Sequence, residues 1–88
     1  MSLGILVRLL EFSNDNAEFV SRSQAKRLLV GFDRFLRIIL DFDGVSAIGQ
    51  AFADEIFRVF ISSHSDVEIL PINCNKRVEK MILRAQAQ

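Results

Sequence analysis

The stretch LDFDGVSAIGQAFADEIF (residues 40–57) joins a strand-like segment to a helix-like segment through a turn marked by glycine. Arg37 to Phe42 contains three consecutive aliphatic residues, which predicts a short central strand covered on both faces. Asp43 to Ser46 predicts the turn. A helix should follow and end near residues 62–64, with these apolar residues at helical spacing: Phe52, Ile56, Val59 and Phe60. Strands of this kind are typical of parallel pairs connected by helices.

The segment before this stretch predicts a hairpin and a helix. Ile5 to Phe12 is rich in branched aliphatic residues, and it ends at the turn formers of residues 13–16. Glu18 to Val20 then predicts a short return strand. Ser21 and Gln24 have the spacing of a capping box, so a helix should start here. Its core-facing stripe would be Ala25, Leu28, Leu29, Phe32 and Phe35 or Leu36, although Gly31 weakens the last turns.

The segment after it predicts one more strand and one more helix. Val67 to Ile72 is the strand, and Pro71 places it at a sheet edge because proline cannot donate to the ladder. Asn73 or Asn75 would cap the last helix, whose apolar residues are Val78, Met81, Ile82 and Ala85. The predicted fold class is α/β with the order β-β-α-β-α-β-α. It has a small, mostly parallel four-stranded sheet with an N-terminal hairpin and helices packed on it.

Length and composition restrict the classes of protein. The 88 residues suffice for a single domain, residues 1–88, and half of them are hydrophobic, which argues against disorder. Eleven basic residues balance eleven acidic ones, so nucleic acid is not an expected partner. The single cysteine and the lack of a long apolar run indicate a cytoplasmic protein with no membrane contact. We expect no cofactor and no enzymatic activity.

Three parts of the sequence resemble a known family. They are Ser21 to Ala25, Leu40 to Val45, and above all Ile48 to Phe57. The chain is similar, from the hairpin to about Ile82, to the STAS-like domains of unknown function. These are relatives of the sulphate-transporter and anti-sigma-factor-antagonist domains. The resemblance implies a non-catalytic regulatory module that docks to a protein, with a histidine-kinase-type ATPase or a transcription-control factor as candidate partners.

The resemblance also draws attention to the start of the second helix. Anti-sigma-factor antagonists typically carry Asp-Ser-Ser-Gly or Asp-Ser-Thr-Gly there, and a kinase phosphorylates one Ser. This chain has Gly49-Gln50-Ala51-Phe52 instead, so the hydroxyl is missing from its expected place. Ser46 lies a few residues upstream and is the alternative phosphorylation site, but a lone serine in a loop is more often a turn residue. A phosphorylation switch is therefore not predicted.

The candidate partner-binding residues surround this turn: Ser46, Gly49, Gln50, Asp54 and Arg22. An alternative function is a small nucleotide- or anion-binding domain, because N–H groups at helix N-termini attract anions. A third interpretation gives Gly49 a purely structural role, in which it lets the backbone pass close to a neighbour. Arg22 stands in the first turn of a helix, where a salt bridge to Asp41 or Asp43 would explain its positive charge, and contact with a partner is the alternative.

Other polar residues carry weaker signals. Asp41 and Asp43 invite a metal interpretation, but no third ligand lies at suitable spacing, so we predict no metal site. Neither Cys74 nor His64 lies in a sequence motif typical of catalytic residues. We therefore predict that Cys74 is a buried or half-buried thiol and that His64 bonds to the C-terminus of the second helix. Lys76, Lys80 and Arg84 form a basic stripe that suits an acidic protein better than nucleic acid. A homodimer is also plausible, because eight Phe and an edge strand would leave an apolar patch uncovered.

Overall fold

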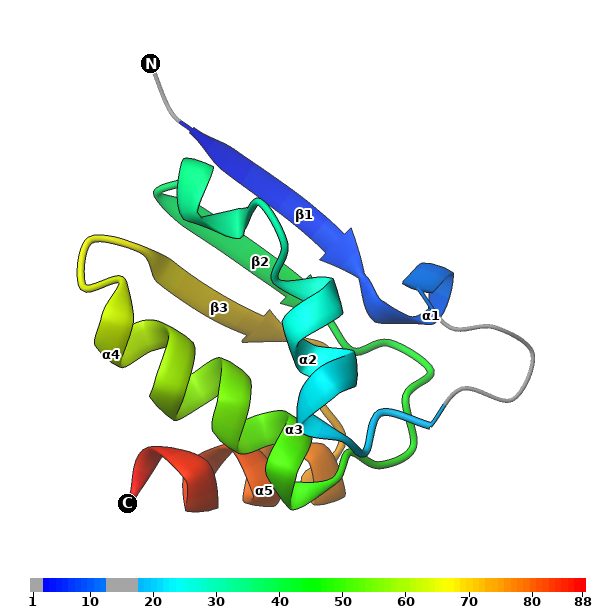
Figure 1. Cartoon of the computed structure of the whole chain (residues 1–88). Coiled ribbons are helices and arrows are strands. Elements are labelled where there is room, and N and C mark those ends of the chain that lie inside the picture. The colour runs from blue at the N-terminus through cyan, green and yellow to red at the C-terminus, as the bar shows by residue number, and fades with distance from the viewer. Residues whose placement is uncertain (1–2, 13–17) are drawn as a thin grey trace.

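The computed structural model describes residues 3–12 and 18–88 (Figure 1). Within them, three parallel strands form one sheet in the order β1-β2-β3. The strands are β1 (Gly4–Arg8), β2 (Arg37–Asp41) and β3 (Glu68–Ile72). Their register places Leu6 beside Ile39 and Ile39 beside Leu70. The chain is therefore a small α/β protein with a parallel sheet, as its apolar, helix-linked strands predict.

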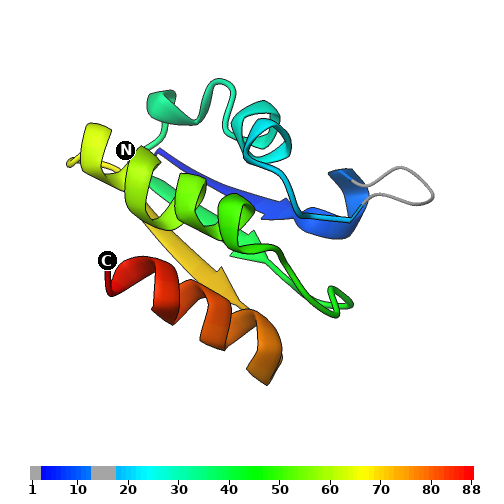
Figure 2. The same ribbon diagram turned by 60° about the horizontal axis from the view of Figure 1, so that its bottom comes forward.

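Helical segments connect the strands and pack against them. They are α1 (Leu9–Phe12), α2 (Arg22–Leu28), the 3₁₀ segment η1 (Phe32–Arg34), α3 (Gln50–Asp54), the π-helical segment η2 (Glu55–Phe60), α4 (Ile61–Ser63) and α5 (Lys76–Gln86). The segments α3, η2 and α4 run on without a break as one central helix, residues 50–63. Figure 2 shows α2, the central helix and α5 side by side on one face of the sheet.

This one-sided arrangement corrects the prediction that β2 is covered on both faces. Side chains that alternate along β2 are buried only when they point to the helices: Ile38 and Leu40 are fully buried, whereas Ile39 between them is half-buried. Leu6, next to Ile39, is 46% exposed. The strand order advances in one direction, and right-handed crossovers then place successive helices on the same face. No helix among residues 3–12 and 18–88 covers the other face of the sheet, which includes Leu6, Ile39 and Leu70.

The predicted N-terminal hairpin and fourth strand are wrong. The chain turns helical at Leu9 instead of extending as a strand to Phe12, and Phe19 makes one isolated parallel bridge to Ile48. The cause is the length of β2, because Arg8 pairs with its last residue, Asp41, and the chain beyond Arg8 has no strand to follow. Leu9 is fully buried in this helical turn. The predicted turn at residues 13–16 lies outside the described residues.

Several local signals are confirmed. Ser21 forms the capping box with Gln24 and starts α2. That helix ends earlier than its apolar stripe suggests, because Gly31 adopts a left-handed conformation with φ of 80°. Asn75, rather than Asn73, caps α5. Pro71 lies on β3, at the edge of the sheet.

The central helix is the middle of the core. It lies between α2 and α5 and over the sheet, so all of its residues from Phe52 to Phe57 are buried. Phe52 is fully buried and its ring centroid lies 5.4 Å from that of Phe19. This burial explains why residues 52–57 are apolar except for two acids. Asp54 and Glu55 are the exceptions, since both are charged and only 7% exposed.

Candidate functional site

The candidate site lies at the carboxyl end of the sheet, where residues 43–49 join β2 to α3. We call this segment the edge loop. Asp41 holds the start of the edge loop. Its Oδ1 atom accepts two hydrogen bonds, one from the Asp43 N–H at 2.9 Å and one from the Asn73 side-chain amide at 3.0 Å. These two bonds, the Asn73 bond first, and the nearby charge of Arg8 lower the pKa of Asp41. Gly44 then makes the turn with φ of 80°.

Asn75 holds the middle of the edge loop. Its amide nitrogen donates to the carbonyl oxygens of Val45 at 3.2 Å and Ser46 at 2.9 Å, while its oxygen accepts from the Val78 N–H at 2.8 Å. One side chain therefore caps α5 and fastens the loop to that helix. The capping residue is visible in the sequence, but the bonds to the loop are not, because they join residues about thirty positions apart.

The end of the edge loop packs against the segment before α2. The Gly49 N–H donates to Phe19 O at 2.7 Å, and the Phe52 N–H donates to Val20 O at 3.2 Å. A Cβ atom on Gly49 would lie 2.8 Å from Val20 O, too close for any side chain. The interpretation that Gly49 lets backbone pass close to a neighbour is thus confirmed.

Two hollows flank the edge loop. One, of about 390 Å³, is lined by residues 18–20, residues 44–49 and Leu10. The other, of about 500 Å³, lies between residues 42–46 and residues 73–75. The loop forms a ridge between them, and Ser46 and Ala47 on it are exposed, as is Gln50 just after it. The ridge exposes polar and small side chains to solvent. The hollow of about 390 Å³ next to it has a mostly apolar lining.

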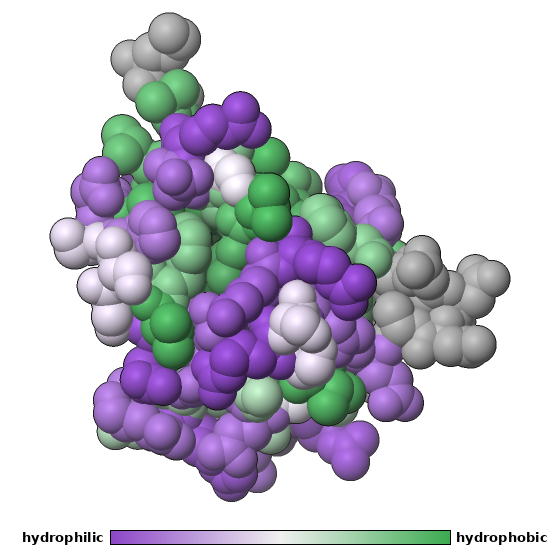
Figure 3. Space-filling view, viewed as in Figure 1, coloured by the Kyte–Doolittle hydropathy of each residue, from purple (hydrophilic) through white to green (hydrophobic). Residues whose placement is uncertain are grey.

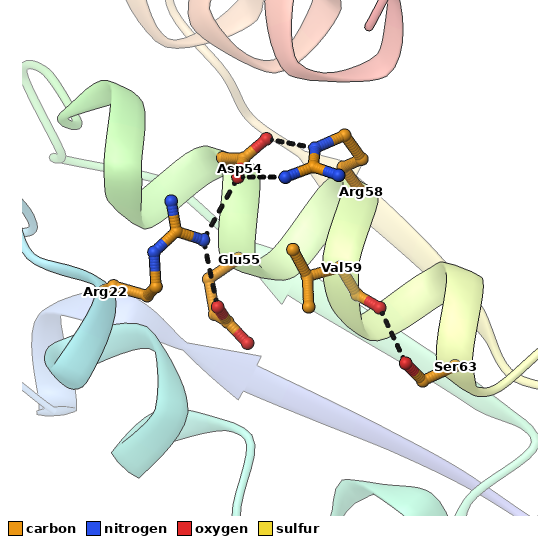
Figure 4. Close-up of polar contacts among 6 residues, drawn as sticks. All are labelled: Arg22, Asp54, Glu55, Arg58, Val59 and Ser63. Atoms are coloured by element: carbon orange, nitrogen blue, oxygen red, sulfur yellow. Dashed lines mark hydrogen bonds and ion pairs between the residues drawn. The ribbon is translucent and has the colours of Figure 1, made fainter.

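Next to the ridge, a network of charged side chains joins α2 to the central helix (Figure 4). Arg22 donates from Nη1 to Asp54 Oδ2 and to Glu55 Oε1, both at 3.0 Å. Arg58 donates to the two oxygens of Asp54 at 2.5 and 2.8 Å. The predicted salt bridge from Arg22 to Asp41 or Asp43 is therefore wrong. The acids that Arg22 meets lie on the central helix, which the crossover from β2 brings beside α2.

The network keeps Asp54 ionised. The hydrogen bond from Arg58, and after it that from Arg22, lower the pKa of Asp54 to about 2 against the opposing effect of burial.

In the helix-side view of Figure 3, hydrophilic residues dominate the lower part of the surface and apolar residues are interspersed above them. Arg22 and Arg58 are each 43% exposed, so the network has a cationic rim over a buried carboxylate.

At the start of each of three helices, one N–H group already has an acceptor within the protein. At α2 the Gln24 N–H donates to Ser21 Oγ, and at α5 the Val78 N–H donates to Asn75. At α3 the Phe52 N–H is taken by Val20 O. Each bond removes one of the N–H groups on which the nucleotide- or anion-binding alternative relies.

A comparison with family models identifies the chain. The model described as "STAS-like domain of unknown function (DUF4325)" matches residues 24–79, more than half of the sequence. The chain belongs to this family. The match begins within α2, contains β2, the edge loop, the central helix and β3, and ends within α5. Comparisons with curated proteins and with solved structures gave no match.

The STAS-like domain brings some of the predicted site residues together. Ser46, Gly49 and Gln50 lie on or beside the ridge, where Ser46 and Gln50 are exposed. Arg22 and Asp54 lie in the charged network, with Asp54 buried by its partners. Sequence reasoning overlooked the roles of Glu55 and Arg58 and the bonds from Asn75 to the edge loop. The spacing of Asp54 and Arg58, four residues apart in a helix, was the signal that could have revealed one of these ion pairs.

His64 and Cys74, two further candidate residues of the STAS-like domain, have surroundings that favour structural roles. His64 ends α4 with Nδ1 at 2.9 Å from Phe60 O, and its ring stacks on that of Phe60, as predicted for a His at a helix C-terminus. Cys74 is half-buried, and burial, then Glu79 and Asp41, raise its pKa, which disfavours the reactive thiolate.

Two further observations concern the described part of the domain as a whole. Within residues 3–12 and 18–88, no group of three or more His, Cys, Asp or Glu side chains is placed to hold a metal ion. In the same residues, no helix has the length and apolar character that a bilayer crossing requires.

Proposed function

We propose that this STAS-like domain is a non-catalytic regulatory module that docks to a protein in the cytoplasm. The contact surface in this proposal is the ridge formed by Ser46, Ala47 and Gln50 with the hollow beside it. The single observation that carries it is the way the edge loop is fastened. Asp41, Asn75 and the backbone of residues 19–20 hold its start, middle and end by hydrogen bonds.

This fastening supports docking because it makes the surface pre-organised. A loop that is already held in one conformation loses little conformational entropy when a partner orders it, and this raises the affinity for a given area of contact. The hollow of about 390 Å³ could receive a side chain of the partner, and Val20 at its rim is 50% exposed. Polar ridge residues around an apolar depression are a common composition of non-obligate interfaces.

The proposed partner is a protein of the kinds that related domains meet, a histidine-kinase-type ATPase or a transcription-control factor. Gln50 stands where phosphorylated relatives have a hydroxyl, so in this proposal regulation depends on binding alone. Ser46 contributes its backbone carbonyl to the bond with Asn75 and its exposed side chain to the contact.

Affinity capture with paired variants tests the proposal. The tagged domain is used as wild type, as Ser46→Arg with Gln50→Arg, and as the control Ser62→Arg with Ser65→Arg. Both double variants add two positive charges at exposed positions, but the control changes the opposite end of the molecule. We expect wild type and control to retain the same protein and the ridge variant to lose it, with all three melting at similar temperatures.

Two results would contradict the proposal. One is a partner that the ridge variant retains as well as the control does, since docking would then use another surface. The other is a dose-dependent rise of the melting temperature with inorganic phosphate or ATP, because binding of such ligands to the native state would favour the anion-binding function.

A further inference from the structure

We infer that two copies of this domain pair through the outer edges of β1 to form one continuous sheet. An edge strand presents unpaired N–H and C=O groups that invite a further strand. Among the described residues, nothing pairs with β1 on the side away from β2. The occupant of this edge, in our inference, is β1 of a second copy running antiparallel.

The two edge strands of the sheet differ in the N–H groups that they can offer to a further strand. Leu3 O accepts from the Arg37 N–H on the inner side of β1, so alternation along the strand directs the N–H groups of Gly4, Leu6 and Arg8 outward. On β3 the Glu68 N–H donates inward to Leu36 O, so residue 71 faces outward. That residue is Pro71, which has no N–H to donate. The edge of β3 is blocked and that of β1 is open.

The sequence of β1 is self-complementary in the antiparallel register centred on Leu6. In this register the two Leu6 residues exchange both of their outward hydrogen bonds, and each Arg8 N–H meets the partner's Gly4 carbonyl. The Arg8 side chain lies beside the residue that has no side chain, and Ile5 faces Val7 of the other copy on the helix side. A shift that centred the pair on Arg8 would place like charges directly opposite each other, which is unfavourable.

The uncovered face of the sheet adds a reason for pairing. Leu6, Ile39 and Leu70 form an apolar row across the three strands, and Leu6 at its open end is 46% exposed. Pairing places the two Leu6 side chains next to each other on this face, so that each covers part of the other. The row then runs without interruption from Leu70 of one copy to Leu70 of the next.

Disulfide trapping tests this register. Cys74, the one cysteine of the chain, is first replaced by Ser. In Cys74→Ser with Leu6→Cys, the two Cα atoms of the pair would be about 5.5 Å apart, within the range of a disulfide. We expect a covalent dimer to form at least about tenfold faster than in Cys74→Ser with Leu83→Cys, because pairing raises the effective thiol concentration. Leu83 is 57% exposed on α5, away from β1.

A second control separates edge pairing from stacking of the uncovered faces. Cys74→Ser with Leu70→Cys places the thiol on the same apolar row but at the blocked edge, and we expect it to crosslink slowly. The inference is overturned if Leu6→Cys crosslinks no faster than Leu83→Cys, or if Leu70→Cys is as fast.

Light scattering on the otherwise unmodified chain gives an independent test. At high concentration we expect the mass to double from 10.0 kDa, and Leu6→Lys to return it to that of the monomer. A monomer at all concentrations, or a dimer that persists in a folded Leu6→Lys variant, overturns the inference. The ridge variant of Ser46 and Gln50 should still dimerise, so failure of the docking proposal and failure of this one are distinguishable.

Discussion

Replacing Asn75 by Ala should loosen the edge loop and destabilise the whole domain. The side chain makes one capping bond, to the Val78 N–H at 2.8 Å, and two bonds to loop carbonyls at 3.2 and 2.9 Å. Loss of the cap costs about 1 kcal/mol, and loss of the loop bonds costs roughly 1–2 kcal/mol. The sum of about 2–3 kcal/mol corresponds to a melting temperature lower by roughly 10–20 °C in a domain of this size.

Urea unfolding followed by circular dichroism measures this change, and Asn75→Ser serves as the matched control. Serine is a good N-cap but is too short to reach Val45 or Ser46, so it should recover about 1 kcal/mol of the loss and no more. Equal stability of the Ser and Ala variants would refute the cap. A loss below about 0.5 kcal/mol for Asn75→Ala would refute the fastening of the loop, because the side chain would then be dispensable.

Three further predictions concern the surroundings of the loop. Gly49→Ala should cost about 1–3 kcal/mol in urea unfolding through contact with Val20, and a neutral result would show that the backbones are not so close. The pKa of Asp54 is lowered from its ordinary value of 3.8 to about 2. The contribution of this carboxylate to folding stability is therefore complete above pH 3.8 and is lost as the pH falls through about 2. A pH titration of the Asp54 carboxyl signal by NMR should have its midpoint near 2, and a midpoint near 3.8 would show that Arg58 and Arg22 do not stabilise the carboxylate. Cys74, whose pKa is raised, should react with a disulfide reagent more slowly in the native protein than in urea, whereas equal rates would show that it is unprotected.

The parts of the fold that depend on local chemistry could be predicted from the sequence. Ser21 with Gln24 and Asn75 each satisfy the first N–H groups of a helix, and this requirement can be read from a few neighbouring residues. The apolar run of β2 marked the centre of the sheet, and Pro71 marked its edge. The family string from Ile48 to Phe57 proved to be the start of the most deeply buried helix.

The errors arose where distant segments decide the local structure. Whether Leu9 to Phe12 continues β1 depends on how far its neighbour β2 extends, and the N-terminal sequence contains no information about that length. The π-helical segment of the central helix has no sequence signal either. The packing of α2 and α5 against the central helix decides the burial of Asp54, so the sequence alone could not show that this carboxylate is buried.

The position of the turn between β2 and the central helix was predicted, but the contacts that hold this turn were not. Ser46, Gly49 and Gln50 lie where a turn between a strand and a helix was expected to carry function. The side chains that hold this turn, Asp41 and Asn75, act across the sheet and from the last helix. Such contacts depend on the strand order, and the sequence alone does not specify which loop ends lie beside each other.

Site-specific photo-crosslinking tests the docking surface most directly. A photoreactive phenylalanine analogue replaces Gln50 on the ridge or, in the control, Ser65 at the opposite end of the molecule, and both positions are exposed. After illumination in a native cell lysate, we expect one dominant crosslinked protein from position 50 that is absent from position 65 and absent when Ser46→Arg is added. The same products from both positions, or a product from position 50 that Ser46→Arg leaves unchanged, would contradict it.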